Sequence, residues 1–552
     1  MNKILIIFFL TICFLQQSCN KKKEIIIFEN IIAIGKPKKE EIGTDWHLKD
    51  IMLDTLAGIS LDKAYNNVIK NRKGEKVIVA VIDTETDTNH EDLRNSFWIN
   101  SEEIPNNNID DDNNGYIDDI HGWNFLGNSN GDNVIFSNYE IIRIIRKYES
   151  MFAGRSETEI DQSLINEFRI YKDVINQKEE LKLTATKTKD RANAILERLK
   201  SSTAFFDSIF NSDNVTIEKI KSYQPVDSVT EKFKKDQLLF MNGGLTKDIL
   251  VNLIDQQNGL IEKSLDINYD ERKIIGDNPY NLEDKTYGNP LVSQNLKEFY
   301  HGTVVSGILT GNRNDTLGIK GISDNIIIMP LAISANGDEH DKDIALAIRY
   351  AVDNGAHIIN MSSGKQYSIN QNWVQEALKY ASENDVLFIT SAGNDNLDLD
   401  SDKNHYYPND NIDNNTEICN SFIMVGANTS FPDENFKYRS SNYGKKNVDI
   451  FAPGIGIMTT IPNNKYRLAN ATSIATPIVT GVAALIKSYY PDFTAAEIKN
   501  ILLESGTSYQ VNVKLNDEDG KTKIVPFSEL SKSGKVVNAY NALLMAEELS
   551  KN

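Results

Sequence analysis

Short, mostly apolar runs recur along two stretches of the chain. A run without polar alternation is typical of a β-strand that is buried on both faces. Five such runs occur, at 77–82, 326–329, 386–390, 422–427 and 448–451. Apolar residues at helical spacing predict helices between them, over 341–354, 372–383 and 476–489. Strands that alternate with helices predict an α/β fold, in which helices cover both faces of a mostly parallel sheet.

The segment 136–289 interrupts this alternation. Neither Gly nor Pro occurs between 155 and 224, and Lys and Glu fill many of the positions between apolar residues. The apolar residues recur at steps of three and four, as at Ile160, Leu164, Phe168, Tyr171 and Ile175. This spacing predicts a long, charged, mostly helical insertion with the form of an antiparallel hairpin. A partner-binding arm and a passive decoration of the fold are both compatible with it.

The N-terminal sequence predicts an export signal. Lys3 precedes an apolar run, 4–15, of 12 residues, which is too short to span a bilayer but suits the core of a secretory signal. Cys19 follows shortly after, and the segment resembles a bacterial lipoprotein signal, in which the cysteine becomes the lipid-modified first residue. An ordinary signal peptide with an incidental cysteine is the alternative. We therefore expect a signal peptide at 1–18, a lipid on Cys19, a tether at 19–44, and a membrane-anchored protein of the cell envelope.

Charge and cysteine content narrow the possible partners. Lys and Arg number 59 against 78 Asp and Glu, so the net charge of −19 disfavours binding to nucleic acid. The chain has three cysteines, Cys13, Cys19 and Cys419. If Cys19 carries a lipid and Cys13 is removed with the signal, Cys419 has no partner for a disulfide. We expect Cys419 to be half-buried and structural.

Four polar residues stand beside the predicted buried elements. Asp83 follows the first apolar strand and Asn394 a later one, at the position where α/β proteins build their sites. His301, with a glycine beside it, and Ser473 each open an apolar helical run. Taken singly, each has an ordinary structural interpretation, such as a turn residue or a helix cap.

Together, these four residues allow nucleophilic acyl transfer. A serine hydroxyl needs a base, which His301 would supply, and a buried carboxylate, Asp83, would orient that base. Asn394 and the backbone N–H of Ser473 would hold the oxyanion. The order Asp, His, Ser along the chain is the order found in subtilisin.

The motifs around these residues resemble those of the subtilisin-like serine peptidases. They read Asp-Thr-x-x-Asp-x-x-His-x-Asp-Leu (83–93), His-Gly-Thr (301–303), Ser-Ala-Gly-Asn (391–394) and Thr-Ser-x-Ala-Thr-Pro (472–477). Residues 360–364, Asn-Met-Ser-Ser-Gly, resemble the substrate-binding strand of that family. The resemblance implies a subtilisin-like three-layer fold over 45–135 and 290–545. It also implies an endopeptidase that cleaves protein or peptide substrates and needs no cofactor for catalysis.

Three residues depart from the family pattern. Glu85 and Ala471 stand where the family usually has Gly, and Ile474 replaces the usual Met. If either Gly position requires a positive φ, the side chain adds strain of about 1–3 kcal/mol. The departures suggest an alternative, a catalytically silent binding protein that uses the insertion for recognition. The presence of all four reactive groups favours the peptidase, and a serine esterase is a third hypothesis.

An acidic loop adds a candidate metal site. Asp110, Asp112, Asn114 and Asp118 are spaced like the first half of a calcium-binding loop, and they are the predicted ligands of a structural calcium ion. His121 occupies the place of the final Glu, so the loop is not a regular EF-hand. An acidic turn without metal is the alternative.

Overall fold

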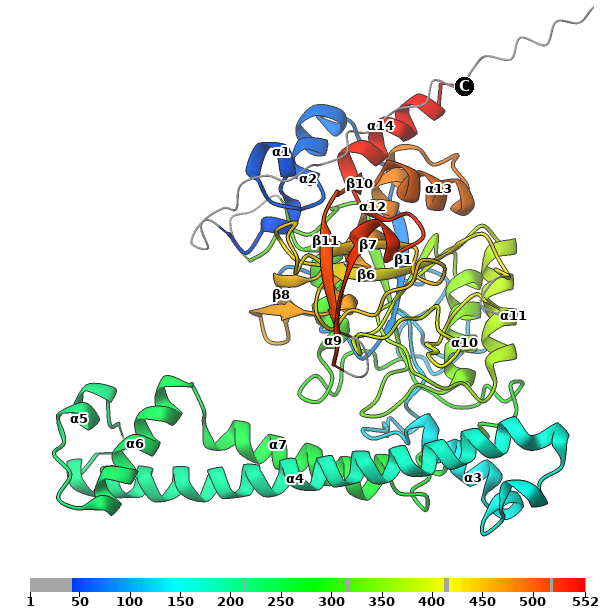
Figure 1. Ribbon diagram of the computed structural model, residues 1–552. Coiled ribbons are helices and arrows are strands. Elements are labelled where there is room, and N and C mark those ends of the chain that lie inside the picture. The colour runs from blue at the N-terminus through cyan, green and yellow to red at the C-terminus, as the bar shows by residue number, and fades with distance from the viewer. Residues whose placement is uncertain (1–41, 213, 314–317, 412–415, 517–519, 552) are drawn as a thin grey trace, which may run out of the picture.

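The computed structural model describes residues 42–551 except 213, 314–317, 412–415 and 517–519 (Figure 1). The predicted signal peptide, Cys19 and nearly all of the predicted tether lie outside the described residues. Within the described part, no helix combines the length and the apolar character that crossing a bilayer requires.

The centre of the molecule is a nine-stranded sheet. Its strands are β1 (Val77–Asp83), β2 (Trp123–Asn124), β3 (Ile326–Ala332), β4 (Ile358–Met361), β5 (Leu387–Ser391), β6 (Phe422–Asn428), β7 (Ile450–Pro453), β10 (Thr507–Ser508) and β13 (Lys535–Val536). The order across the sheet is β10-β13-β7-β6-β5-β4-β1-β3-β2. Every neighbouring pair runs parallel except β10 and β13. The predicted α/β fold with a mostly parallel sheet is confirmed.

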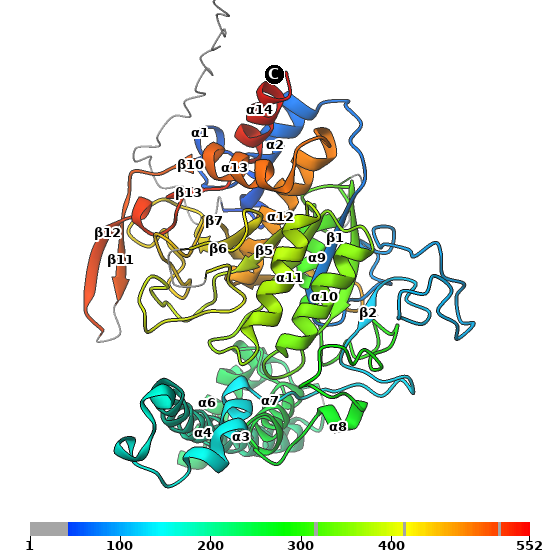
Figure 2. The same ribbon diagram turned by 90° about the vertical axis from the view of Figure 1, so that its right-hand side faces the viewer.

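Two hydrophobic cores lie on opposite faces of this sheet. Along β1, Val79 and Val81 belong to one core, and Ala80 and Ile82 belong to the other, as the alternation of side chains along a strand requires. The first core also contains residues of α9 (His301–Thr310), α12 (Thr472–Tyr489), α13 (Ala495–Ser505) and α14 (Ala539–Leu549). The second contains residues of α10 (Asp341–Asp353) and α11 (Gln371–Glu383). The result is three layers, with the sheet between two layers of helices (Figures 1 and 2).

The direction in which the chain winds through the sheet reverses at β1, which lies between β3 and β4. The chain passes from β1 to β3 on one side and returns to β4 on the other, so the direction of winding reverses at β1. Open parallel sheets bind their ligands in the crevice at such a reversal. Asp83, the last residue of β1, therefore stands where a site is expected.

The insertion forms a long helical arm. Its helices are α3 (Glu140–Phe152), α4 (Ile165–Phe210), α5 (Ile217–Ser222), α6 (Ser228–Asn242), α7 (Lys247–Gly259) and α8 (Arg272–Ile275). Helix α4 has 46 residues, so it is roughly 70 Å long at 1.5 Å per residue. It runs out past the body of the protein, and α6 and α7 lead the chain back along it (Figure 1). The long helix and the hairpin form agree with the prediction.

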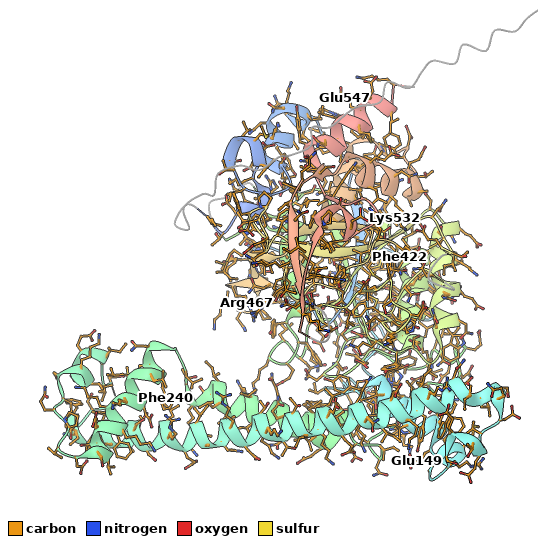
Figure 3. All side chains as sticks on the ribbon, viewed as in Figure 1. Glu149, Phe240, Phe422, Arg467, Lys532 and Glu547 are labelled. Carbon is orange, nitrogen blue, oxygen red and sulfur yellow. The ribbon has the colours of Figure 1, made fainter. Side chains whose placement is uncertain are left out.

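Each end of the arm has its own small core. The end beside the body buries side chains of α3 and α4, and Tyr367 and Ile369 of the body pack against them. The distal end buries Leu196 of α4, Phe240 of α6 and Leu250 of α7. Figure 3 shows Phe240 far from the body, within the distal helices.

A buried charge network fixes the arm to the body. Lys365 is fully buried, with its Nζ 3.2 Å from Glu140 of α3 and 2.9 Å from Asp341 of α10. Arg143 of α3 pairs with Glu140 at 2.6 Å and donates to the carbonyl oxygen of Glu339 at 3.0 Å. Lys365 comes directly after the predicted substrate-binding strand, so the arm is held against that part of the body.

Several smaller elements complete the fold. They are the helices α1 (Ile51–Asp54) and α2 (Leu61–Ala64), the hairpin β8 (Ile455–Ile461) and β9 (Lys465–Asn470), and the hairpin β11 (Asn512–Asn516) and β12 (Thr522–Pro526). Cys419 is half-buried, as predicted, and burial raises the pKa of its thiol to about 11.

Candidate active site

His301 is held beside the end of β1 by a close backbone contact. It is the first residue of α9, and the next residue is Gly302. A side chain at Gly302 would place its Cβ 2.5 Å from the carbonyl oxygen of Thr84, so only glycine allows this approach. The N–H of Gly302 also donates to Thr84 Oγ1 at 2.9 Å. The approach brings the ring of His301 to Asp83.

Asp83, His301 and Ser473 form a continuous chain of hydrogen-bonding groups. His301 Nδ1 lies 2.8 Å and 3.0 Å from the two carboxylate oxygens of Asp83, and Nε2 lies 3.0 Å from Ser473 Oγ. Asp83 is 1% exposed and Ser473 8%, whereas the side chain of His301 is 33% exposed. The carboxylate is thus shielded from water, while solvent or a ligand can reach the imidazole.

The surroundings of His301 favour its protonated form. Burial acts to lower the pKa of the imidazole, but the charge of Asp83 and the hydrogen bond to it act in the opposite direction and prevail. The pKa of His301 is therefore raised above its usual value of 6.5. An imidazole with this bias can accept a proton from the hydroxyl beside it and hold the resulting charge.

Asn394 lies next to the N-terminus of α12. Its side-chain Oδ1 accepts a hydrogen bond from the backbone N–H of Thr472 at 2.9 Å, which fixes the orientation of the amide. The side chain is exposed, and Nδ2 is the part of the amide that remains to donate. The N–H of Ser473 lies in the first turn of α12, where backbone N–H groups have no partner within the helix. The predicted oxyanion donors are thus next to each other in the structure.

The two departures at glycine positions introduce no backbone strain. Ala471 has an extended backbone, with φ −177° and ψ 172°, and Glu85 is not among the residues with positive φ. The Glu85 carboxylate is fully buried and accepts hydrogen bonds from the backbone N–H groups of Gln294 and Asn295. Ile474, the third departure, is buried in the core that contains α12. Neither glycine position therefore has the positive φ at which a side chain would add backbone strain.

The predicted substrate-binding strand lies beside the strand that leads to Asn394. Its first two residues end β4, which pairs with β5. Asn360 is buried, and its side-chain Oδ1 accepts a hydrogen bond from Thr480 Oγ1 of α12 at 2.8 Å. A Cβ on Gly364 or on Gly393 would lie 2.6 Å from the ring of Tyr406. Tyr406, which the motifs did not single out, thus lies against the segments that follow both strands.

The acidic loop gathers a different set of carboxylates from the predicted one. Ligand atoms of Glu103, Asp112 and Asp119 lie within 4.8 Å of one another. Burial, with a contribution from the charge of Asp112, raises the pKa of Asp119 to about 6. Asn114, a predicted ligand, donates to both Asp112 and Asp119. Asp112 and Asn114 are therefore at this cluster.

The other two predicted ligands have backbone partners. Asp110 accepts from the N–H groups of Asn114 and Gly115, and Asp118 accepts from those of Asn107 and Asn108. The sequence interpretation missed Glu103 because it lies before the loop, and it missed Asp119 because that residue stands at a position of the loop that the calcium pattern does not use.

The chain is similar to several known proteases. It is 32% identical over 209 residues to alkaline elastase YaB of Bacillus sp. (strain YaB), a match that covers 38% of this chain and 50% of that protein. It is 35% identical over 190 residues to a thermophilic serine proteinase of Bacillus sp. (strain AK1), covering 34% of this chain and 42% of the relative. The matches thus span half or less of the length of these relatives.

A solved protease from Pseudoalteromonas arctica PAMC 21717 aligns with a TM-score of 0.36 and 26% identity, over 45% of this chain and 70% of the other. The family model described as Peptidase_S8, subtilase family, matches residues 74–522, which is most of the chain. The match includes Asp83, His301, Asn394 and Ser473 together with the whole insertion. The chain belongs to the subtilase family.

Proposed function

We propose that the protein is a serine endopeptidase that hydrolyses peptide bonds through an acyl-enzyme on Ser473. The observation that carries the proposal is the chain of contacts from Asp83 through His301 to Ser473 Oγ. The relatives named above are described as an elastase and a serine proteinase, which agrees with protein or peptide substrates.

Each of the three residues has a distinct part in this reaction. Ser473 Oγ attacks the scissile carbonyl while His301 Nε2 takes the hydroxyl proton. His301 then gives this proton to the leaving amine. It later takes a proton from the water that attacks the acyl-enzyme and returns that proton to Ser473 Oγ as the acid product leaves. Asp83 keeps the proton on Nδ1 and stabilises the imidazolium. No cofactor is needed for these steps.

Asn394 and the Ser473 backbone N–H stabilise the negative charge that develops on the carbonyl oxygen. Because Thr472 fixes Oδ1 of Asn394, Nδ2 is ready to donate without reorganisation. Removal of one such donor costs roughly 100- to 1000-fold in kcat. We expect a loss of that size in Asn394→Ala, and near-full turnover of that variant would contradict the assigned role.

A fluorophosphonate probe, which reacts with activated serines, tests the proposal. We expect the wild type to be labelled and to cleave a broad peptide library, and Ser473→Ala to do neither. Folded wild type that is neither labelled nor active would instead support a silent binding protein that uses the arm. Hydrolysis of esters without any cleavage of peptides would support a serine esterase.

We also propose a structural calcium ion at Glu103, Asp112 and Asp119. Carboxylate oxygens are the ligands that calcium prefers, and a cation would offset the charge of three neighbouring acids. Calcium at about 100 times its Kd would stabilise the fold by about 2.7 kcal/mol. We expect a chelator to lower the Tm of the wild type but not that of Asp112→Asn. Asp132→Asn, an exposed acid outside the cluster, should respond like the wild type.

We propose, finally, that the protein is exported and held at the cell envelope by a lipid on Cys19. The proposal rests on the N-terminal sequence alone. Expression with a clickable fatty acid should label the wild type and not Cys19→Ser, and the variant should be released from the membrane fraction. Equal release of both proteins would favour an ordinary signal peptide.

A further inference from the structure

One buried side chain binds the backbone on both sides of Asn394. Asn442 is fully buried, and its Nδ2 donates to the carbonyl oxygen of Ala392 at 2.8 Å. Its Oδ1 accepts from the backbone N–H of Asp395 at 3.0 Å and from that of Leu397 at 2.8 Å. A single amide therefore fixes the turn that carries Asn394, from the residue after β5 to three residues past Asn394.

The backbone of Asn442 adds a fourth contact. Its N–H donates to the carbonyl oxygen of Gly393 at 3.0 Å. Gly393 has a φ of +95°, and a Cβ there would lie 2.6 Å from Asn442 Nδ2. The glycine before Asn394 thus supplies both the turn and the space that the Asn442 side chain occupies.

Buried neighbouring residues hold the segment that carries Asn442. The neighbouring Ser441 is fully buried, and its Oγ accepts from the N–H of Ala427, in β6, at 3.0 Å. Lys437, also buried, donates to the carbonyl oxygen of Ser441 at 2.7 Å and to Asn396 Oδ1 at 2.9 Å. The turn of Asn394 is thus tied to the sheet through two buried side chains, Asn442 and Lys437.

Asn394 depends on this support because the backbone of the turn sets the place of its side chain. Its side chain is exposed, and its contact with Thr472 fixes the amide only if the backbone of the turn is in place. A donor acts on the developing oxyanion only when it is positioned before the reaction, and a shift of about 1 Å costs about 100-fold in rate. A side chain that fixes this backbone therefore acts on the transition state through Asn394.

We infer that Asn442 is a positioning residue that holds the oxyanion donor Asn394 in its reactive place. The inference rests on the proposed function, since it requires that Asn394 stabilises a transition state. It assigns Asn442 no contact with substrate. Its loss should therefore lower kcat and leave KM nearly unchanged.

The test compares Asn442→Ala and Asn394→Ala, singly and together, on one peptide substrate. We expect Asn442→Ala to lower kcat by about 10- to 100-fold, with KM within about threefold of the wild type. In the Asn394→Ala background the same substitution should change kcat by less than about threefold, because residues that act as a unit are not additive.

Asn538→Ala is the matched control for a loss of stability alone. Asn538 is also a buried asparagine with three side-chain hydrogen bonds, two from Nδ2 to Ser60 and Thr507 and one to Oδ1 from Asn541, and it caps α14. We expect this variant to lose stability, seen as a lower Tm, and to keep its kcat. If Asn442→Ala does not fold, Asn442→Asp replaces it, because the isosteric carboxylate keeps the acceptor for Asp395 and Leu397 but removes the donor to the carbonyl oxygen of Ala392, so that kcat should still fall.

Two results would overturn the inference. One is a folded Asn442 variant with the kcat of the wild type. The other is a fall in kcat that is equally large with and without the side chain of Asn394. A wild type that has no activity contradicts the proposed function instead, so the two failures are distinguishable.

Discussion

At the scale of single residues, His301 should set the pH dependence of the reaction. The imidazole accepts the proton of Ser473 only when it is neutral, and the charge of Asp83 outweighs burial to raise its pKa above 6.5. Reactivity should therefore be low in acid and rise with pH, with a midpoint above 6.5. The measurement is the rate of fluorophosphonate labelling of Ser473 as a function of pH.

Asp83→Asn provides the comparison for this pH profile. The neutral amide removes the charge that raises the pKa of His301 and leaves burial, which lowers it. We expect a much lower rate of labelling, with a midpoint shifted to lower pH. A wild-type midpoint below 6.5, or a midpoint that Asp83→Asn leaves in place, would mean that another group controls the reactivity.

The residues that the structure brings together at the candidate site could be predicted from the sequence because each belongs to a local motif. Asp83 and Asn394 follow apolar strands, and the carboxyl ends of parallel strands meet at one edge of the sheet. Asn442 could not be predicted in the same way. It is 48 residues beyond Asn394, and only the packing of the loop between β6 and β7 against the turn after β5 shows their relation.

At the scale of elements, strands with a local sequence signal could be predicted, and strands without one could not. The five predicted apolar runs correspond to β1, β3, β5, β6 and β7, which are buried on both faces. The hairpins β8–β9 and β11–β12 were not predicted. Most residues of β9 and β12 are exposed, so these strands lack the apolar signal, and the pairing in each hairpin depends on the turn between its strands.

The first residue of α12 also could not be predicted from local sequence. The apolar spacing predicted a helix from 476, whereas the helix begins at Thr472 and includes Ser473. Thr472 and Ser473 are typical of caps rather than of helix interiors. They lie in the first turn of the helix, where the side chain of Asn394 accepts a hydrogen bond from the backbone N–H of Thr472.

The distal part of the arm should unfold independently of the site. Phe206 of α4 is fully buried there, with its ring 5.1 Å from that of Phe205 and 5.5 Å from that of Tyr223. Phe206→Ala should destabilise this part by about 3–5 kcal/mol. We expect amide exchange to accelerate in α5 and α6, while the rate of Ser473 labelling stays that of the wild type.

Ile209→Ala is the control for this substitution, because Ile209 lies on the same helix with its side chain half exposed. It should change neither amide exchange nor labelling appreciably. If Phe206→Ala slowed labelling as well, the arm would be coupled to the site and would not be an independent folding unit.

At the scale of the whole molecule, the junction between arm and body was beyond prediction. The sequence shows Glu140, Arg143 and Lys365 as three charges among many, and most charged residues are solvated. In the structure all three are buried, and Glu140 pairs with both Arg143 and Lys365. Removal of one partner from such a buried set is strongly destabilising, by about 3–5 kcal/mol. The arm is therefore an integral part of the fold at its root, even though its distal end has a separate core.

The free energy of unfolding of the whole protein should depend on pH through a buried histidine that is neutral in the folded state. His47 is buried near the N-terminal end of the described chain, and burial lowers its pKa to about 4, against the opposing charges of Asp45 and Asp62. Between pH 6.5 and about 4 the unfolded chain binds a proton at His47 that the folded chain does not. This difference destabilises the folded state by about 1.4 kcal/mol per pH unit as the pH falls, or about 3 kcal/mol over the interval.

Other groups titrate in the same interval with the opposite sign, so the total pH dependence does not isolate His47. Burial raises the pKa of Asp338 to about 6 and that of Asp410 to about 7, and both acids favour the folded state as the pH falls. The difference between the wild type and His47→Leu removes these contributions, because both proteins contain the same acids. We expect urea unfolding to show the variant gaining stability relative to the wild type from pH 6.5 down to about 4, and no further gain below. A difference that does not change with pH would mean that His47 is protonated in the folded protein or exposed to water.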